Sequence, residues 1–425
     1  MGHGPRRVPM ARMAPSTSLG ASGRILGLVV LMTPLSGAGI DIYVPSLPSM
    51  TEYFHTTPAL IQLTITLYLL GYGAAQLAMG AASDVLGRRP VVVAGSLGYT
   101  AMALGVALAP TVSLLLAFRL LQGIALSATG TLNRSILTDT FSGAELAKAS
   151  NAMTLAWALG PIVAPVLGAW LHERFGWQAC FWFLTAYGLV VFVALLTSLP
   201  ETNAQRQRLD IGAFTRDVAS FIGDHVFVAA ALVLALMYSY IAVFSMVAPF
   251  LVQVVLHHSA GTYGWIGLGM GVAWFAGNSV NRLLLGGRRR HQLAVVSAFV
   301  LAILAPLSML TLSLVVPLGL TLIVAPVALL FLSGGLLFPN LFTVAMSRSG
   351  SSAGIASAVL GTLFILGTSL VSAVVSRFSP HSLQPLAATL LALAVLAALL
   401  YAMYVRRALA ALESPGPARA VVVEG

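Results

Sequence analysis

Long apolar runs separated by short polar segments recur along the whole chain. A membrane-spanning helix needs about 20 predominantly apolar residues, because the hydrocarbon core of a bilayer is about 30 Å thick. The runs predict twelve membrane-spanning helices, over residues 24–48, 59–81, 91–109, 112–136, 149–171, 178–199, 226–254, 260–284, 292–312, 315–341, 353–377 and 384–405. The longest polar interruption, Pro200–Asp224, divides six spans from six.

Composition leads to the same fold class. Of 425 residues, 58% are apolar and only 8% are charged, whereas soluble domains carry roughly 25% charged residues. The chain is therefore predicted to be an all-α membrane protein. Its single cysteine, Cys180, excludes an intrachain disulfide and a cysteine-rich metal site. The absence of a P-loop, an HExxH motif and a nucleophile elbow argues against an ATPase or hydrolase. We expect no enzymatic activity, no metal and no cofactor.

The basic residues predict the orientation in the membrane. With the N-terminus in the cytoplasm, Arg174 and Arg377 fall at external loops, and Arg119 and Arg134 fall inside the fourth span. The remaining Lys and Arg lie in internal loops, tails or inner span ends, as the positive-inside rule expects. Both termini are therefore predicted to be cytoplasmic. The net charge of +10 reflects this topology, and we expect no nucleic-acid partner.

The predicted organisation has five parts: a flexible basic cytoplasmic arm (1–23), an N-terminal six-helix half (24–199), a cytoplasmic central loop (200–225), a C-terminal six-helix half (226–405) and a cytoplasmic tail (406–425). Two signals suggest that the halves are repeats. Asp41 precedes Pro45 in "DIYVP" of the first span as Ser245 precedes Pro249 in "SMVAP" of the seventh, and basic loops follow the second and eighth spans. Parallel six-helix repeats are a recurrent plan of transporters.

Four segments carry a family resemblance. "GAASDVLGRRPV" resembles the loop signature of the major facilitator superfamily, and "LLLAFRLLQGIALSA" is similar to the fourth-span motif of its drug:proton antiporters. "LGPIVAPVLGAWL" resembles the fifth-span antiporter motif, with Ala169 where a second glycine is usual. "PLSGAGIDIYVPSLP" is similar to the first span of the Bcr/CflA branch. The resemblance covers the whole chain and implies two pseudo-symmetric six-helix halves and export of small organic compounds, including multidrug efflux.

Asp41 and Arg119 are the candidates for proton coupling. An ionisable side chain at membrane depth costs at least about 2.5–3.5 kcal/mol, so it usually faces a cavity or a partner. From the helical rise, both residues fall in the outer half of the membrane at similar depth. Their pairing would be either a structural ion pair or a proton site, because a nearby guanidinium favours the ionised carboxylate.

An absence of acids in the second half singles out Asp41. No Asp or Glu occurs from His225 to Val405, and the other acids of the first half fall at membrane edges. By elimination, Asp41 is the predicted coupling site. The alternative for Arg119 is a helix-packing anchor bonded to backbone carbonyls.

The charged loop after the second span is predicted to be a gating latch, formed by Asp84, Gly87, Arg88, Arg89 and Asp139. The resemblance implies that Asp84 meets the start of the eleventh span, where a carboxylate would meet the positive end of a helix dipole. Arg88 or Arg89 would pair with Asp139, and Gly87 would permit the tight turn. A loop that fixes topology by its positive charge alone is the alternative.

Small residues recur every four positions along the fifth span, at Ala156, Gly160, Ala164 and Gly168. Together with Pro161, which permits bending, they predict close packing between the halves. Aromatic residues inside the spans, Phe338 among them, face lipid, the core or a cavity. The candidates for lining a substrate cavity are Tyr43, Tyr68, Tyr72, Gln122, Trp157, Tyr238, Phe244, Trp274 and Phe364, because cavities for organic ligands are rich in aromatic faces.

These features predict a proton-coupled antiporter in the inner membrane of a bacterium. Its expected partners are a small organic substrate, protons and the lipid bilayer, and we expect a monomer. An exporter of one endogenous metabolite or siderophore, and a proton-independent facilitator, are alternatives. A receptor or scaffold is disfavoured, because signalling requires neither an acid at membrane depth nor paired halves.

Overall fold

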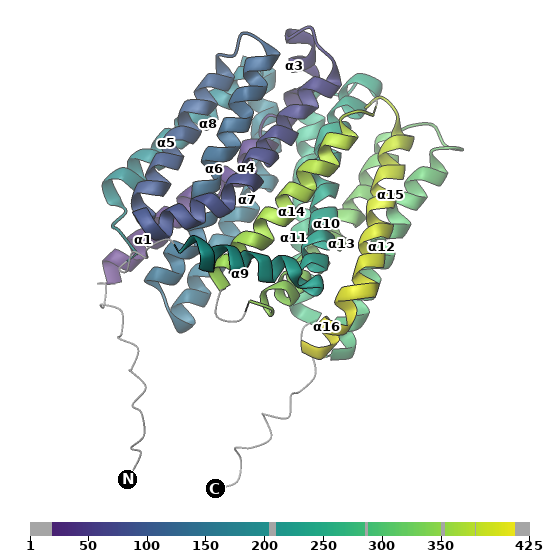
Figure 1. The fold of residues 1–425 in the computed structure, drawn as a ribbon. Coiled ribbons are helices and arrows are strands. Elements are labelled where there is room, and N and C mark those ends of the chain that lie inside the picture. Colours follow the sequence, from purple (N-terminus) through teal and green to yellow (C-terminus); the bar gives the residue numbers. More distant parts are fainter. Residues whose placement is uncertain (1–18, 204–209, 285–287, 350–352, 379, 413–425) are drawn as a thin grey trace, which may run out of the picture.

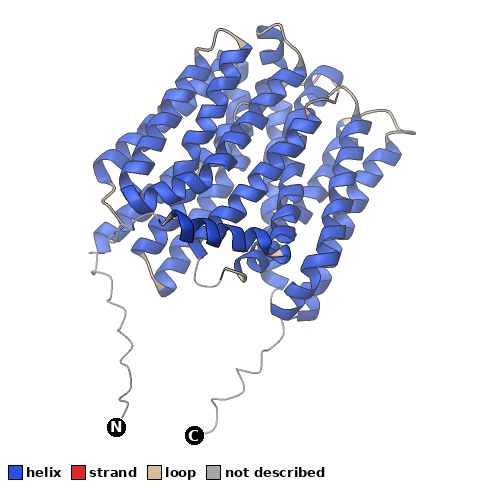
Figure 2. Ribbon diagram, viewed as in Figure 1, coloured by secondary structure: helices blue, strands red, loops and turns tan. Residues whose placement is uncertain are grey.

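Every element of the described chain is a helix. The computed structural model describes residues 19–203, 210–284, 288–349, 353–378 and 380–412. Within these ranges the chain contains helices, turns and loops but no strand (Figure 2). The predicted all-α membrane architecture is confirmed.

The helices form two groups that lie side by side (Figure 1). The first group contains α1 (Leu19–Met32), α2 (Leu35–Asp41), α3 (Leu47–Tyr53), α4 (Pro58–Leu86), α5 (Arg88–Ala107), α6 (Val112–Thr140), α7 (Gly143–Phe175) and α8 (Gln178–Ser198). The second contains α10 (His225–Phe250), α11 (Ala260–Leu284), α12 (Arg288–Leu312), α13 (Leu320–Met346), α14 (Ala353–Val375), α15 (Leu383–Leu400) and α16 (Arg406–Leu412). Packing of α4 against α14 and of α7 against α11 joins the halves.

Eleven helical segments of the described chain are long and apolar enough to cross a membrane. Helix α11, the eighth predicted span, is not among them although it has 25 residues. Glycine recurs along its sequence, "AGTYGWIGLGMGVAWFAGNSVNRLL", and lowers its hydropathy. Helix α11 packs against α7 and α13, and its glycines allow the close approach of both helices.

The first helix α1 begins, and the last helix α16 ends, at the same end of the bundle, which we call the terminal face (Figure 1). Helix α9 (Ile211–Gly223) crosses the bundle at this face. It lies within the segment 200–225, for which the sequence predicted only a loop. Its Phe221 ring packs against Phe227 of α10, with centroids 5.2 Å apart. We call the other end of the bundle the opposite face.

The junction between α9 and α10 is fixed by Asp224. Its carboxylate accepts hydrogen bonds from the backbone amides of Val226 and Phe227 and from Arg348, whose Nε lies 2.7 Å away. Burial alone would raise the pKa of Asp224, but these bonds outweigh burial and hold the pKa below its usual value. The start of α10 is thereby tied to the end of α13.

The sequence predicted a single helical span over 24–48, but the structure divides this span into several shorter helices. It breaks after Met32 and again after Asp41, and a short 3₁₀ turn, Val44–Ser46, precedes α3. Pro34 and Pro45 at these breaks lack the amide hydrogen that a continuous helix needs. The Gln253 side chain donates a hydrogen bond of 2.8 Å to the Pro45 carbonyl oxygen. The break therefore ends α2 at Asp41, in the interior of the bundle.

Gly160 and Gly168 of the small-residue stripe on α7 pack within their own half, which corrects the expectation that they join the halves. A Cβ at Gly160 would contact Gly37 and Ala38 of α2, and one at Gly168 would overlap the carbonyl oxygen of Ile42. The adjacent face of α7 meets α11 instead. There, glycines of α11 supply the small side of the contact: Gly264 faces Pro165 and Ala169, and Gly271 faces Ile162.

We predict that Gly168→Ala destabilises the protein by about 1–3 kcal/mol, because the added methyl overlaps backbone and forces α2 away from α7. Gly269→Ala is the matched control, since a Cβ there has no neighbour within 4 Å. Thermal unfolding in detergent should show a lower midpoint for the first variant only. Equal midpoints would show that α2 can shift without cost.

Candidate functional site

Two adjoining cavities lie between the halves. The first is lined by Ser36, Gly37, Ile40, Asp41, Ile65, Leu69, Trp157, Pro161, Tyr238, Ile241, Ala242 and Ser245. The second is lined by Ser36, Ile40, Tyr68, Leu69, Tyr72, Trp157, Tyr238, Phe338, Phe364 and Ile365. The walls therefore come from α2, α4 and α7 of the first half and from α10, α13 and α14 of the second.

The cavities are small in this structure. Their volumes are about 30 and 50 Å³, and one water molecule needs at least about 10–15 Å³ measured in this way. A drug-sized ligand occupies a pocket of about 300–1,000 Å³. The space holds a few water molecules, and it has to widen before an organic substrate can enter.

Asp41 opens into the first cavity from the last residue of α2. Its carboxyl group makes no hydrogen bond or ion pair with any residue that the structure describes, and it is partly exposed to the cavity. Ser245, its counterpart in the predicted repeat, lines the same cavity from α10. The two positions that the sequence pattern related therefore face each other across the boundary between the halves.

Arg119 is enclosed in a cage of aromatic and polar groups. Its side chain is fully buried, and its guanidinium carbon lies 4.1 Å from the Tyr68 ring centroid and 4.7 Å from that of Tyr43. Arg119 donates hydrogen bonds to the Gln122 amide oxygen, at 2.7 Å, and to the Tyr43 hydroxyl, at 3.3 Å. A longer bond of 3.4 Å reaches the Thr64 carbonyl oxygen. These contacts satisfy the charge without a carboxylate.

Asp41 and Arg119 are not paired in this structure. Their side chains form no ion pair, and Tyr43, two residues after Asp41, takes the place of a carboxylate beside the guanidinium. The Tyr43 hydroxyl also lies 2.8 Å from that of Thr64. Tyr43 is thus the structural link between the broken first span and the arginine of α6.

The predicted cavity residues divide into two groups. Tyr68, Tyr72, Trp157, Tyr238 and Phe364 line the cavities. The other four do not line them: Tyr43 and Gln122 hold Arg119, and Phe244 and Trp274 both pack against Phe331 in the core of the second half. Phe338 also lines the second cavity. The sequence identified it as an aromatic residue within a span but did not include it among the cavity candidates.

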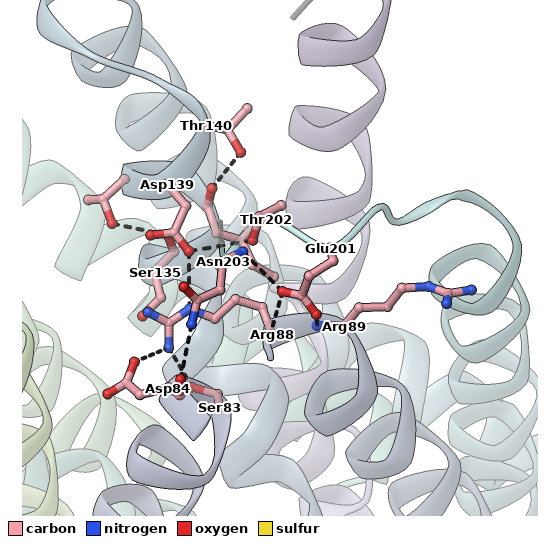
Figure 3. Close-up of polar contacts among 12 residues, drawn as sticks. Ser83, Asp84, Arg88, Arg89, Ser135, Asp139, Thr140, Glu201, Thr202 and Asn203 are labelled. Atoms are coloured by element: carbon pink, nitrogen blue, oxygen red, sulfur yellow. Dashed lines mark hydrogen bonds and ion pairs between the residues drawn. The ribbon is translucent and has the colours of Figure 1, made fainter. Parts of the chain in front are cut away.

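The charged loop after α4 forms a compact cluster at the terminal face (Figure 3). The Arg88 guanidinium lies 2.5 Å from an Asp84 oxygen and 3.0 Å from an Asp139 oxygen. Gly87 has φ of 105°, a conformation that glycine adopts without strain. Arg89 takes no part in pairing with Asp139, and its guanidinium donates instead to the Leu196 carbonyl oxygen.

Glu201, which the sequence candidates omitted, completes this cluster. Its carboxylate accepts hydrogen bonds from the backbone amides of Arg88, at 2.8 Å, and Arg89, at 3.3 Å (Figure 3). It therefore caps the N-terminus of α5, where a helix dipole favours negative charge. The sequence feature that could have identified Glu201 is its position just after the sixth span, on the same side of the membrane as the charged loop after α4.

The predicted contact of Asp84 with the start of the eleventh span is not among the described contacts. Asp84 pairs with Arg88 of its own half, and Asn203 donates to its backbone carbonyl oxygen. Part of the segment preceding α14, residues 350–352, lies outside the described residues. The described cluster joins the loop to α6 and to the segment after α8.

Hydrogen bonds join the halves toward the opposite face. Thr66 of α4 donates to the Ser372 hydroxyl of α14, at 3.1 Å, and Ser369 donates to the Thr66 carbonyl oxygen, at 3.0 Å. Gln62 donates to the Met246 carbonyl oxygen at 2.8 Å. Nearer the surface, the Gly261 amide donates to the Glu173 carboxylate at 2.7 Å. Together these bonds seal the opposite face.

The chain matches one protein family and several bacterial relatives. The family model described as Major Facilitator Superfamily matches residues 29–371. An uncharacterised MFS-type transporter of Bacillus subtilis, YdgK, is 29% identical over 89% of this chain and 93% of its own. The multidrug resistance protein MdtL of Shigella dysenteriae is 29% identical over 80% of this chain and 85% of its own. A chloramphenicol resistance protein of Pseudomonas aeruginosa is 36% identical over 42% of this chain and 43% of its own.

Solved structures agree on the fold. A D-xylose–proton symporter superposes with a TM-score of 0.72, covering 88% of this chain and 97% of its own at 16% identity. A bacterial homologue of the lysosomal transporter Spinster, in an inward-facing and unoccupied conformation, superposes with a TM-score of 0.68 at 15% identity. It covers 94% of this chain and 100% of its own. At these identities the likeness concerns the fold alone.

We predict that Glu201→Ala lowers the free energy of unfolding by about 1 kcal/mol, as expected for loss of a helix cap. The control is Glu145→Ala, because Glu145 is exposed in the first turn of α7 and caps no amide that the structure describes. Chemical denaturation of the two purified variants should separate them. If Glu145→Ala costs as much as Glu201→Ala, the capping role of Glu201 is wrong.

Proposed function

Because this chain belongs to the Major Facilitator Superfamily, we propose that it is a proton-coupled antiporter that exports small organic compounds and takes part in multidrug efflux. The observation that carries the proposal is Asp41, a carboxyl group without a described partner in a cavity between two halves of a transporter fold. A fixed structural ion pair would not leave such a group open to the cavity. A group that binds and releases protons has to be open in this way.

The second half strengthens the choice of Asp41. It has no Asp or Glu from His225 to Val405, so α10, α13 and α14 bring no carboxyl group to the cavity. We propose that Arg119, the second candidate for proton coupling, affects Asp41 indirectly through Tyr43. Arg119 anchors Tyr43 and thereby the residues that follow Asp41, so movement of this part of the first span would change the surroundings of the Asp41 carboxyl group.

The substrate is proposed to enter the cavity lined by Tyr68, Tyr72, Trp157, Tyr238 and Phe364. Flat aromatic walls accept varied organic ligands by burial of apolar area. Two relatives are named for resistance to several drugs or to chloramphenicol, which makes chloramphenicol the first compound to test. Efflux of one endogenous metabolite or siderophore would instead appear as counterflow of that compound alone.

The terminal face is proposed to be cytoplasmic in a bacterial inner membrane, because the basic loops gather there and positive loops remain inside. The cluster of Asp84, Gly87, Arg88, Arg89 and Asp139 is proposed to hold the cytoplasmic end of α4, α5 and α6 as one unit during gating. A monomer is sufficient for this mechanism, since one chain supplies both halves of the cavity.

We predict that Asp41→Asn abolishes proton-driven efflux, because asparagine keeps the shape of the side chain but exchanges no proton. Asp41→Glu should retain part of the activity, since it keeps an acid about one methylene away. Drug-dependent proton movement in everted vesicles measures both effects. Glu52→Gln, which removes an exposed acid at the opposite face, is the matched control and should transport normally.

If Asp41→Asn still pumps with normal pH dependence, another residue carries the proton and the proposal for Asp41 is wrong. A protein that transports equally well without a pH gradient would be a facilitator. The two outcomes can be distinguished, because transport by the wild type depends on the proton gradient in the first case and does not in the second.

The orientation makes a separate prediction. Reporter fusions in the segment 204–209 and after residue 412 should both report a cytoplasmic location, whereas a fusion in the loop after α7 should report the periplasm. A periplasmic reading at either of the first two places would contradict the proposed topology.

A further inference from the structure

Arg134 lies where the path between the halves approaches the terminal face. It belongs to α6, six residues before the helix ends at Thr140, or about 9 Å along the axis. Its contacts come from the other half. The guanidinium carbon lies 4.6 Å from the Phe342 ring centroid of α13, and a guanidinium nitrogen lies 3.5 Å from the Ser357 hydroxyl of α14.

The second cavity leads directly to this arginine. Tyr72 and Phe338 line the cavity from α4 and α13. A Cβ at Gly130, one turn before Arg134, would contact the Tyr72 ring and hydroxyl. Phe338 stacks on Phe342 with centroids 6.3 Å apart and ring planes 19° apart. Both walls of the cavity therefore continue, one helical turn further, to Arg134.

The charge of Arg134 is not neutralised within the described structure. Arg134 forms no ion pair with a described residue, and its side chain is exposed. The only described hydrogen bond is 3.5 Å long, at the outer limit for such a bond, although a guanidinium has five donors. Arg119 on the same helix differs, because it is fully buried and saturated by its cage.

The neighbouring helix adds a hydroxyl group. Ser357 lies in the second turn of α14, which begins at Ala353. The second half supplies no acid that could neutralise Arg134, since no Asp or Glu occurs from His225 to Val405. An anion placed between α6 and α14 would meet a guanidinium and a hydroxyl donor together.

We propose that Arg134 and Ser357 form a subsite for the anionic group of an organic substrate, such as a carboxylate or sulfonate. The aromatic cavity next to it would bind the apolar part of the same molecule. Among the compounds that enter the cavity, the subsite would therefore favour amphiphilic organic anions with an aromatic or otherwise apolar body. This inference rests on the proposed transport function only in placing the subsite on the transport path.

The test compares two probes that differ in one charge. 1-Anilinonaphthalene-8-sulfonate and N-phenyl-1-naphthylamine share the same two aromatic groups, and only the first carries a sulfonate. Binding to protein in lipid nanodiscs is followed by energy transfer from protein tryptophan, with empty nanodiscs subtracted. Neither transport nor a proton gradient is needed, so failure of the proposed antiport leaves the measurement intact.

We expect the wild type to bind the sulfonate more tightly than the neutral probe. Arg134→Gln should weaken sulfonate binding at least about tenfold, as expected for loss of a charged hydrogen bond, and change neutral binding less than about twofold. Arg134→Lys should retain part of the preference, and Ser357→Ala should weaken sulfonate binding by a few fold. Arg216→Gln, a change at an exposed arginine of α9, should alter neither affinity.

Three results would overturn the proposal. If Arg134→Gln weakens both probes equally, Arg134 holds the halves together and recognises no charge. If it weakens neither, or if the wild type shows no preference for the sulfonate, no anion subsite exists there.

Discussion

The cost of placing charge in hydrocarbon is the constraint on which the interior of this protein depends. A charged side chain at membrane depth needs a partner, a polar cage or access to water. Arg119 has a cage of Tyr43, Tyr68 and Gln122. Asp41 opens into a cavity with room for a few water molecules. Arg134 is exposed toward the terminal face. The three charged groups therefore lie in three different environments.

Backbone geometry determines the environment of each of these charged side chains. The break in the first span ends α2 at Asp41 and turns Tyr43 toward Arg119. That break is held from both sides, because Gly168 of α7 lies against the Ile42 carbonyl oxygen and Gln253 binds the Pro45 carbonyl oxygen. Irregular backbone inside a membrane is tolerated where protein buries it or where it lines a cavity. The small-residue stripe of α7 therefore serves the first span more than the contact between halves.

The sequence alone predicts the features that depend on composition and spacing. Length and hydropathy locate the spans, and charge spacing brings Asp84, Arg88 and Asp139 to one loop cluster. It does not predict which face of a helix meets which neighbour. For that reason the packing of Gly160 and Gly168 against α2, and the use of Tyr43 in place of Asp41 beside Arg119, were missed. Glu201 was missed for a different reason, because a capping role depends on where a distant chain segment returns to the cluster.

The seal of the opposite face explains how such a closed structure can still open. Its bonds near Thr66, Ser369 and Ser372 join neutral groups, and hydrogen bonds of this kind within membranes contribute only about 0.6 kcal/mol each on average. Shifting a two-state equilibrium from 1:99 to 99:1 takes about 5.5 kcal/mol, which is more than a few such bonds supply. A seal of this strength can be reversed by protonation or by ligand binding. A bound anion between Arg134 and Ser357 would act at the other end, where it would bridge α6 and α14. Closure at one face would then depend on the ligand itself, while closure at the other depends on weak bonds that the ligand does not touch.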